Sequence, residues 1–143
     1  MNTETKFKLR SRIIDPSIAT PALTASANGR TVINLYAATT SDDSYGNIVY
    51  GTNRLFEIPI GHVGLVFPME NCSIKDLVFA NSFEMICSTQ CEEVKLRYKK
   101  FNSDRIYTCS GDDSYTTESY GIGDLVGQLL IMPAPQIEIE EIN

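Results

Sequence analysis

The sequence has few of the residues and apolar runs on which several common functions depend. It contains one histidine, and its 12 lysine and arginine residues are outnumbered by 18 acidic residues, which gives a net charge of -6. A negative chain repels phosphate backbones and anionic lipid unless its basic residues cluster, so we expect no nucleic-acid partner. No apolar run approaches the roughly 18 residues that span a bilayer, and residues 1–6 lack a secretory apolar core. These absences predict an intracellular protein that is neither secreted nor bound to a membrane.

Metal binding and nucleophilic catalysis also lack their usual residue patterns. The four cysteines Cys72, Cys87, Cys91 and Cys109 form no CxxC pair, and a chain of 143 residues does not need disulfide bonds for stability. Cys87 and Cys91 with His62 could supply three zinc ligands, but the spacing has no second matching pair. A Ser-His-Asp or Cys-His arrangement would require His62, beside a predicted turn, to meet a nucleophile. We therefore expect reduced thiols, no metal site and no cofactor.

The sequence does contain enough apolar residues for one compact domain spanning residues 1–143. Its 43% hydrophobic and 21% charged content is ordinary for a globular protein. Short apolar stretches bounded by turn residues recur along the chain, whereas helical spacing is rarely sustained. The pattern predicts an all-β sandwich or jelly roll with at most one short helix, after Pro68. The predicted strands are residues 7–14, 32–37, 48–50, 56–60, 63–67, 77–80, 93–101, 105–109, 127–132 and 136–142.

The last predicted strand has an unusually regular alternation. Ile137 and Ile139 are interleaved with Gln136, Glu138 and Glu140. Alternate residues of a strand point to opposite sides, so this segment would have one apolar face. That face needs a partner, for which another subunit is one candidate.

Charged residues elsewhere are interpreted as solvent-exposed. Lys95, Arg97 and Lys99 alternate along one predicted strand and would share its solvated face. Two acidic stretches, residues 41–45 and 111–115, repeat Asp-Asp-Ser-Tyr but lack the spaced ligands and final glutamate of a dedicated calcium loop. We expect them to be polar turns between strands.

Several stretches occur in the order and approximate spacing of the motifs of the dUTP pyrophosphatase (dUTPase) family, which the chain resembles over most of its length. They cover the family's opening strand, its first motif, the strand into its second motif, its uridine-binding hairpin, its fourth motif and its tail. The stretches are residues 7–10 (FKLR) with 14–16 (IDP), 34–38 (NLYAA), 61–68 (GHVGLVFP), 81–93 (NSFEMICSTQCEE), 123–124 (GD) with 127–131 (GQLLI), and 133–141 (PAPQIEIEE).

The resemblance implies a dUTPase-like β-clip or jelly-roll protomer that assembles as a homotrimer with active sites at subunit interfaces. It also implies a chemistry. In the family, a carboxylate of the third motif activates water for attack on the α-phosphate, while magnesium and cationic side chains hold the triphosphate.

The catalytic positions of the family are degenerate in this sequence. Cys87 stands where the resemblance places the catalytic Asp, and a thiol of ordinary pKa cannot act as that general base. Asn34 stands where the first-motif Asp supports magnesium, and a neutral amide has less affinity for a hard dication. Both changes predict a protein without the family's chemistry.

The phosphate-binding positions have changed too. The second motif of the family begins with Arg-Ser, whereas this sequence has Met69, Glu70 and Asn71. Leu125 replaces the fourth-motif cation, and we expect the glycine-rich C-terminal arm, which carries the fifth motif, to be lacking. Charge-assisted hydrogen bonds contribute about 1.5–3 kcal/mol each, so losing several should abolish useful triphosphate affinity.

Some positions of a nucleotide pocket persist. Asn81 matches the uracil-contacting Asn and Gln128 the fourth-motif Gln, while Gln90 replaces the sugar-discriminating Tyr of the hairpin. Asn81 has the alternative role of fixing a turn, and Gln128 that of satisfying a hydrogen bond at an interface. If a pocket survives, we expect these residues and the second-motif segment to line it.

These departures predict a catalytically inactive homotrimer with a structural or interaction role. Members of this family are often carried by phages, so an auxiliary or decoration protein of a phage capsid is the most specific role we expect. It would bind other protein subunits and reside in the host cytoplasm or the virion. Two alternatives stay open. One is a dUTP diphosphatase that uses Mg²⁺ and a displaced base, Glu84, Glu92 or Glu93, to form dUMP and pyrophosphate, and the other is a nucleotide-sensing regulatory binding module around Asn81.

Overall fold

The computed structural model describes residues 8–25, 32–72, 75–81, 84–88, 92–100 and 119–143. In these residues the secondary structure consists of strands and one 3-10 turn, which confirms the predicted all-β class. The predicted short helix after Pro68 is the turn η1 (Glu70–Cys72). The strands are β1 (Arg10–Ile13), β2 (Thr24–Ala25), β3 (Val32–Tyr36), β4 (Thr39–Asp42), β5 (Ile48–Gly51), β6 (Arg54–Glu57), β7 (His62–Pro68), β8 (Leu77–Phe79), β9 (Glu84–Ile86), β10 (Lys95–Lys100) and β11 (Leu125–Pro133).

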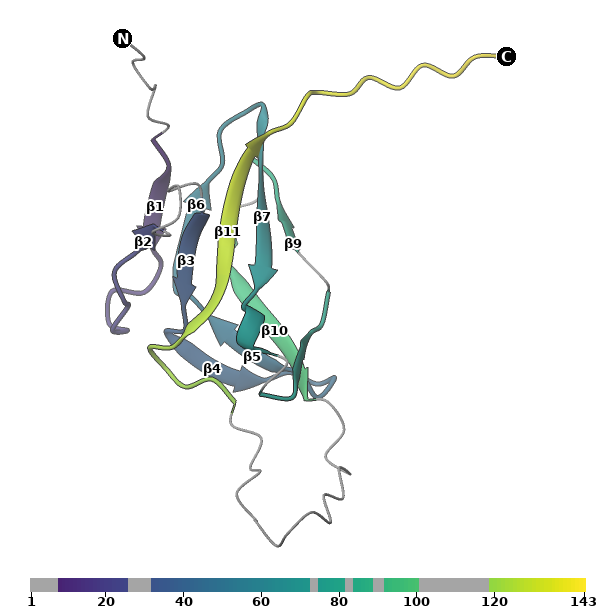
Figure 1. The fold of residues 1–143 in the computed structure, drawn as a ribbon. Helices are drawn as coiled ribbons and strands as arrows, with labels where there is room; N and C mark the ends of the chain where they lie inside the picture. The colour runs from purple at the N-terminus through teal and green to yellow at the C-terminus, as the bar shows by residue number, and fades with distance from the viewer. Residues whose placement is uncertain (1–7, 26–31, 73–74, 82–83, 89–91, 101–118) are drawn as a thin grey trace, which may run out of the picture.

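The strands form three sheets. A five-stranded sheet has the order β2-β3-β11-β7-β9, a four-stranded sheet has the order β4-β5-β10-β8, and β1 pairs with β6. All of the pairings are antiparallel. Figure 1 shows β11 and β7 upright beside each other, with β4 and β5 crossing below them. The core therefore lies where side chains of the two larger sheets meet.

Alternation decides which residues enter that core. On β10, Leu96 and Tyr98 are fully buried, while Lys95 and Lys99 are exposed and Arg97 is half-buried. The predicted solvated face of this strand is confirmed at both lysines. Gly127 is required on β11 because a Cβ there would clash with the Leu96 side chain and lie 2.9 Å from a backbone oxygen of β7.

Three strands were missed by the sequence analysis: β2, β4 and β9. Each has between two and four residues and no continuous apolar run. The segment 41–45, predicted as a turn throughout, begins inside β4, because Thr39 to Asp42 pair with the buried strand β5. These strands exist because a neighbouring strand supplies their hydrogen bonds.

The strand predicted for residues 136–142 is wrong for a single chain. Residues 134–143 form no strand, and Ile137 and Ile139 are 80% and 84% exposed. Figure 1 shows this segment running away from the sheets after β11. Because no strand of the described residues lies beside it, its backbone has no ladder to join among them. The strand predicted for residues 105–109 and the acidic stretch 111–115 lie outside the described residues.

Within the part of the chain that the structure describes, no helix is long and apolar enough to cross a membrane.

Candidate functional site

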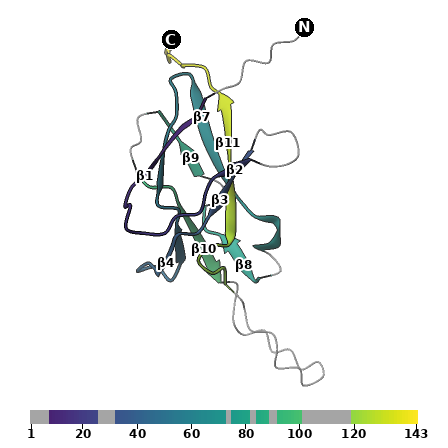
Figure 2. The same cartoon turned by 90° about the vertical axis from the view of Figure 1, so that its left-hand side faces the viewer.

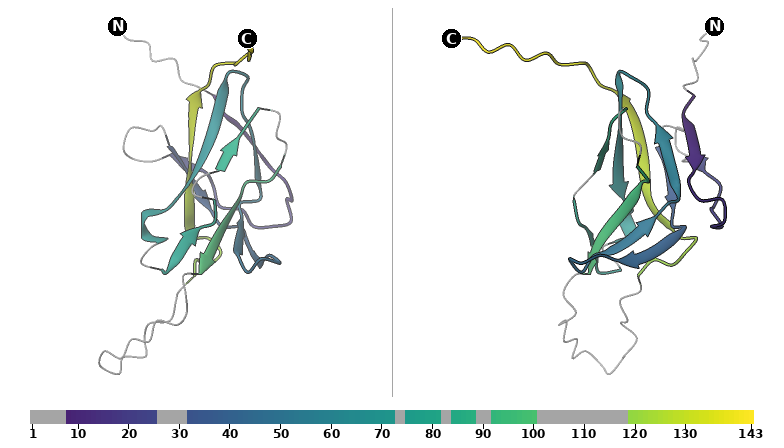
Figure 3. Two further views of the ribbon diagram at one scale, coloured as in Figure 1. Left: turned by 90° about the vertical axis from the view of Figure 1, so that its right-hand side faces the viewer. Right: turned by 180° about the vertical axis from the view of Figure 1, so that it is seen from behind.

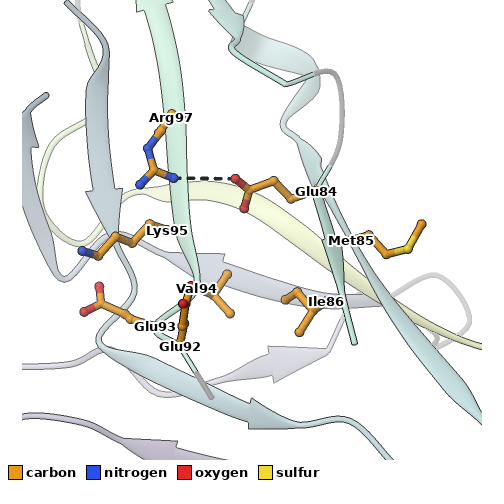
Figure 4. A pocket seen from close by; sticks show the side chains of 8 residues that line it. All are labelled: Glu84, Met85, Ile86, Glu92, Glu93, Val94, Lys95 and Arg97. Carbon is orange, nitrogen blue, oxygen red and sulfur yellow. Dashed lines mark ion pairs between the residues drawn. The ribbon is translucent and has the colours of Figure 1, made fainter. Parts of the chain in front are cut away.

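A cavity of about 520 Å³ opens between β9 and β10. Both ends of the predicted uridine-binding hairpin, residues 81–93, contribute to its lining. Its walls carry three carboxylates, two cations and a few apolar side chains. They are Glu84, Met85, Ile86, Glu92, Glu93, Val94, Lys95 and Arg97. Figure 4 shows Arg97 and Glu84 facing each other across the opening, with Met85 pointing away from them. The cavity is therefore strongly polar, with more acidic than basic groups.

Arg97 connects the two sides of this cavity. Its guanidinium lies 3.7 Å from Glu84 Oε1 and 3.9 Å from Asp43 Oδ2, so it bridges β9 and the turn between β4 and β5. The Arg97 side chain is 38% exposed, and both ion pairs are long, so each adds little stability. The two ion pairs hold the Arg97 guanidinium against carboxylates of the same chain. It is therefore not left to bind a phosphate.

Glu93 approaches the backbone of β5 on the same side of the molecule. A Cβ built on Gly51 would clash with the Glu93 carboxylate and the Thr39 hydroxyl. Glycine at position 51 thus leaves room for a carboxylate at the mouth of the cavity. The sequence analysis had considered Glu84, Glu92 and Glu93 only as displaced bases, and the structure places all three around one cavity.

Asp43 organises the turn beside Arg97. Its carboxylate accepts hydrogen bonds from the backbone amides of Asn47 and Tyr45, each at 2.9 Å, and from the Asn47 side chain at 2.9 Å. These bonds favour the charged form, and the pKa of Asp43 is lowered mainly by the Asn47 amide, with a smaller contribution from Arg97. The turn is consequently tied by an ionised carboxylate.

The lowered pKa of Asp43 predicts a loss of stability in acid. A carboxyl group whose pKa is lower in the folded state stabilises that state above its ordinary pKa of 3.8, and the contribution disappears as the pH falls through the folded-state value. Asp43→Asn should therefore flatten the dependence of the unfolding free energy on pH below about 4. Urea unfolding at pH 3 to 7 measures it. Ser44→Ala, in the same turn, should keep the wild-type slope, and an unchanged slope in Asp43→Asn contradicts the assignment.

The first-motif and fourth-motif positions meet on the outer face of the five-stranded sheet. Asn34 on β3 is directly opposite Gln128 on β11, and Thr24 on β2 is opposite Asn34. Gln128 Nε2 donates to Asn34 Oδ1 at 3.2 Å, and Asn34 Nδ2 donates to Thr24 Oγ1 at 3.0 Å. The Thr24 hydroxyl is in turn 2.8 Å from the Tyr36 hydroxyl. Both ends of the Asn34 amide are therefore engaged within the sheet.

The second-motif segment packs into the fold. Met69 contacts the hydrophobic core, and Asn71 accepts a hydrogen bond of 2.6 Å from the Tyr120 hydroxyl. Burial raises the pKa of Tyr120 to about 12, so this hydroxyl remains a neutral donor, and Lys75 Nζ lies 5.1 Å from the centre of its ring. Met69 and Asn71 have structural contacts, and Glu70 belongs to η1.

The hairpin positions lie apart from the hydrogen-bonded series Thr24, Asn34 and Gln128, which we call the amide row. Cys87 is exposed, and Asn81 Nδ2 is 3.4 Å from Glu84 Oε1 at the edge of the cavity. Gln90 lies outside the described residues. Because β3 and β9 are separated by β11 and β7, Asn34 is about 14 Å across the sheet from the β9 strand that leads to Cys87. The two positions that the resemblance assigns to the catalytic site, Asn34 and Cys87, therefore do not meet within one protomer.

Among the described residues, no group of three His, Cys, Asp or Glu side chains could hold a metal ion. Asn34, which stands where the resemblance places the metal-supporting Asp, accepts the hydrogen bond from Gln128 with its side-chain oxygen.

The all-β fold of this protomer is also found in solved structures. No family model and no curated protein matches the chain. Structures of two phage dUTPases superpose on it over nearly its whole length. A variant of the dUTPase of Staphylococcus bacteriophage 80alpha is 16% identical with a TM-score of 0.71, covering 96% of this chain and 97% of its own. Another 80alpha variant, with dUpNHpp, is 17% identical with a TM-score of 0.72, covering 96% and 97%.

A variant of the dUTPase of Staphylococcus aureus phage phi11, whose structure reveals a coordinated structural Mg(II) ion, is 20% identical with a TM-score of 0.71, covering 95% of this chain and 97% of its own. The chain therefore has the dUTPase fold, as its motif order predicted. At this identity the similarity establishes the fold, and the activity has to be argued from the site.

Proposed function

We propose that this protein is a catalytically inactive homotrimer of dUTPase fold, one domain over residues 1–143, that acts by binding other proteins. The observation that carries the proposal is the state of Asn34, whose amide is used on both sides by Gln128 and Thr24. A carboxylate at this position could accept from several donors and bind a dication, whereas this amide completes a row of sheet hydrogen bonds. Cys87, at the position of the family's base, adds a second and independent loss.

The outer face of the five-stranded sheet supports the homotrimer. Next to the amide row, β3, β11, β7 and β9 present an aligned apolar row, of which Met85 is 54% exposed. The following row adds Met132, 41% exposed. Exposed apolar patches of this extent mark interfaces, and a second copy of this chain is the occupant that the dUTPase fold suggests. The aligned row is Val32, Leu130, Leu65 and Met85.

The trimer is tested by its mass in solution. Light scattering should give about three times the chain mass of 15.9 kDa, and Leu130→Glu, at the centre of the row, should shift the protein to monomers. Tyr45→Glu is the matched control, because Tyr45 is 85% exposed in a turn on another part of the molecule. A monomeric wild type contradicts the homotrimer.

The structural similarity to phage proteins supports a phage role, and an auxiliary or decoration protein of the capsid is the particular role that we propose. Such a protein would reside in the host cytoplasm before assembly and in the virion afterwards. Purified virions separated on a density gradient should contain the chain in a fixed ratio to the major capsid protein. Its absence from virions contradicts the capsid role.

A nucleotide-sensing regulatory module is the second candidate. It is favoured by the cavity of about 520 Å³ that persists at the hairpin, with Asn81 at its edge. It is also favoured by the 80alpha dUTPase, which is described as controlling the transfer of virulence genes by a proto-oncogenic G protein-like mechanism. Calorimetric titration with dUpNHpp separates the candidates. Saturable binding without hydrolysis of dUTP selects the module, and no binding favours the capsid role.

A further inference from the structure

One carboxylate oxygen in the hairpin cavity attracts donors from two different segments of the chain. Glu84 Oε1 accepts a hydrogen bond from Asn81 Nδ2 at 3.4 Å and lies 3.7 Å from the Arg97 guanidinium. Figure 4 shows the Glu84 carboxylate directed across the opening at Arg97. A carbonyl or phosphate oxygen of a bound ligand needs donors of the same kinds. Glu84 therefore makes the contacts that an acceptor oxygen of such a ligand would make.

The backbone of Arg97 is fixed by the four-stranded sheet. It pairs with Val49 of β5 on one side, and its carbonyl oxygen accepts from the Ala80 amide at 2.9 Å on the other. The guanidinium is also 3.9 Å from Asp43 Oδ2, in the turn between β4 and β5. The Arg97 side of the ion pair with Glu84 is thus anchored by neighbouring segments.

The Glu84 side of the pair is less constrained. Strand β9 has three residues, lies at the edge of the five-stranded sheet and pairs with β7 alone among the described strands. The left view of Figure 3 shows β9 above β10, on the side turned toward the viewer. A short edge strand makes few contacts, so a side chain on it can be moved or replaced with little effect on the rest of the fold.

The remaining charges do not give the cavity a second site for an anion. Among the described lining residues, Lys95 is the one other cation, and Glu92 and Glu93 outnumber it. Strand β1, which carries Arg10 and Arg12, lies on the opposite side of the molecule from β9, as Figures 1 and 2 show. The attraction of an anion to this cavity therefore depends on Arg97.

We propose that Glu84 is a specificity-determining residue, which excludes phosphate-bearing ligands from the hairpin cavity by occupying Arg97 and Asn81. A carboxylate of the same chain competes at an effective concentration on the order of millimolar or higher, whereas a free nucleotide loses translational freedom on binding. The proposal rests on the proposed loss of nucleotide chemistry. It assigns that loss, at this cavity, to one side chain.

Calorimetric titration with dUpNHpp, without added Mg²⁺, compares Glu84→Ala with Glu92→Ala. Each variant removes one carboxylate from the same cavity, so the two change its charge equally, but only Glu84→Ala releases Arg97 and Asn81. We expect Glu84→Ala to bind at least about five-fold more tightly than either Glu92→Ala or the wild type. The double variant Glu84→Ala/Arg97→Gln should lose this gain.

A second replacement guards against a change of fold. Glu84→Gln keeps the shape of the side chain and removes its charge, so it should shift the affinity in the same direction as Glu84→Ala. The Glu84 side chain is 26% exposed and Glu92 is exposed, so all single variants should unfold at about the wild-type urea concentration.

Equal affinities of Glu84→Ala and Glu92→Ala, including no detectable binding by either, overturn the proposal. A gain that survives Arg97→Gln also overturns it, and so does a wild type that binds dUpNHpp as tightly as Glu84→Ala. The release of dUMP from dUTP by the wild type decides the proposed inactivity. Because the difference between two variants decides the role of Glu84, the two proposals can fail separately.

Discussion

Purified protein incubated with dUTP and Mg²⁺ is expected to release no dUMP or pyrophosphate above the buffer blank. Losing a general base costs about 10²- to 10⁴-fold in rate, and the resemblance places Cys87 at the position of that base. Losing two cations for the phosphates, where the resemblance places them at Met69 and Leu125, at about 1.5–3 kcal/mol each, is expected to cost a further factor of about 10² to 10⁴. The 80alpha dUTPase, assayed beside it, is the positive control.

Restoring single residues should not restore turnover. Cys87→Asp returns a carboxylate to the hairpin, and Asn34→Asp returns one to the amide row, but each leaves Met69 in the core and Leu125 in place of a cation. Turnover by the wild type near the control rate would contradict the inactive trimer. Glu84→Gln, Glu92→Gln and Glu93→Gln, compared one at a time, would then identify the displaced base around the cavity.

Replacing Tyr98 is expected to give the largest loss of stability of any single residue that we consider. The side chain is fully buried, and its ring centre lies 5.3 Å from that of Phe79, 5.5 Å from that of Tyr120 and 5.9 Å from that of Tyr50. Tyr98→Ala removes these contacts and leaves a cavity, so it should lower the free energy of unfolding by about 3–5 kcal/mol. That is a large fraction of the about 5–15 kcal/mol typical of a domain.

Two further variants divide this effect and control for it. The Tyr98 hydroxyl donates to the Val126 carbonyl at 2.5 Å, and burial raises the pKa of Tyr98 so that the donor stays neutral. Tyr98→Phe leaves this buried carbonyl without its donor and should cost about 1–3 kcal/mol. Tyr45→Ala, at an 85% exposed position, should change the value by less than about 0.5 kcal/mol. Urea unfolding measures all three, and equal losses at positions 45 and 98 would contradict the assigned core.

Some features of the candidate site were predicted from the sequence, and others were not. The motif order predicted the fold, but it did not predict that Asn34 and Gln128, from two different motifs, would be hydrogen-bonded to each other. The sequence also did not predict the surroundings of Arg97, which was interpreted as a solvated side chain. Arg97 lines the hairpin cavity and forms ion pairs with Glu84 and Asp43. The alternation on β10 gave the correct face for Arg97, but the partners come from segments about 13 and 54 residues away in the sequence.

The tail illustrates the same division. The alternation of isoleucine and glutamate predicted an apolar face on residues 136–142, and both isoleucines on that face are exposed. A strand needs a neighbour to complete its hydrogen bonds, and the part of the chain that the structure describes supplies none there. The alternation within the segment predicted its apolar face. The segment itself does not specify which strand would pair with it.

Local patterns thus determined the all-β class, the turn after Pro68 and the inward faces of the long strands. These features depend on residue type and on spacings of a few residues, so they can be read directly from the sequence. Tertiary structure alone decided the short strands β2, β4 and β9, the amide row that uses both ends of Asn34, and the mixed charges around the cavity. Those features require segments that are distant in sequence to lie together, and only the packing of the sheets brings them there.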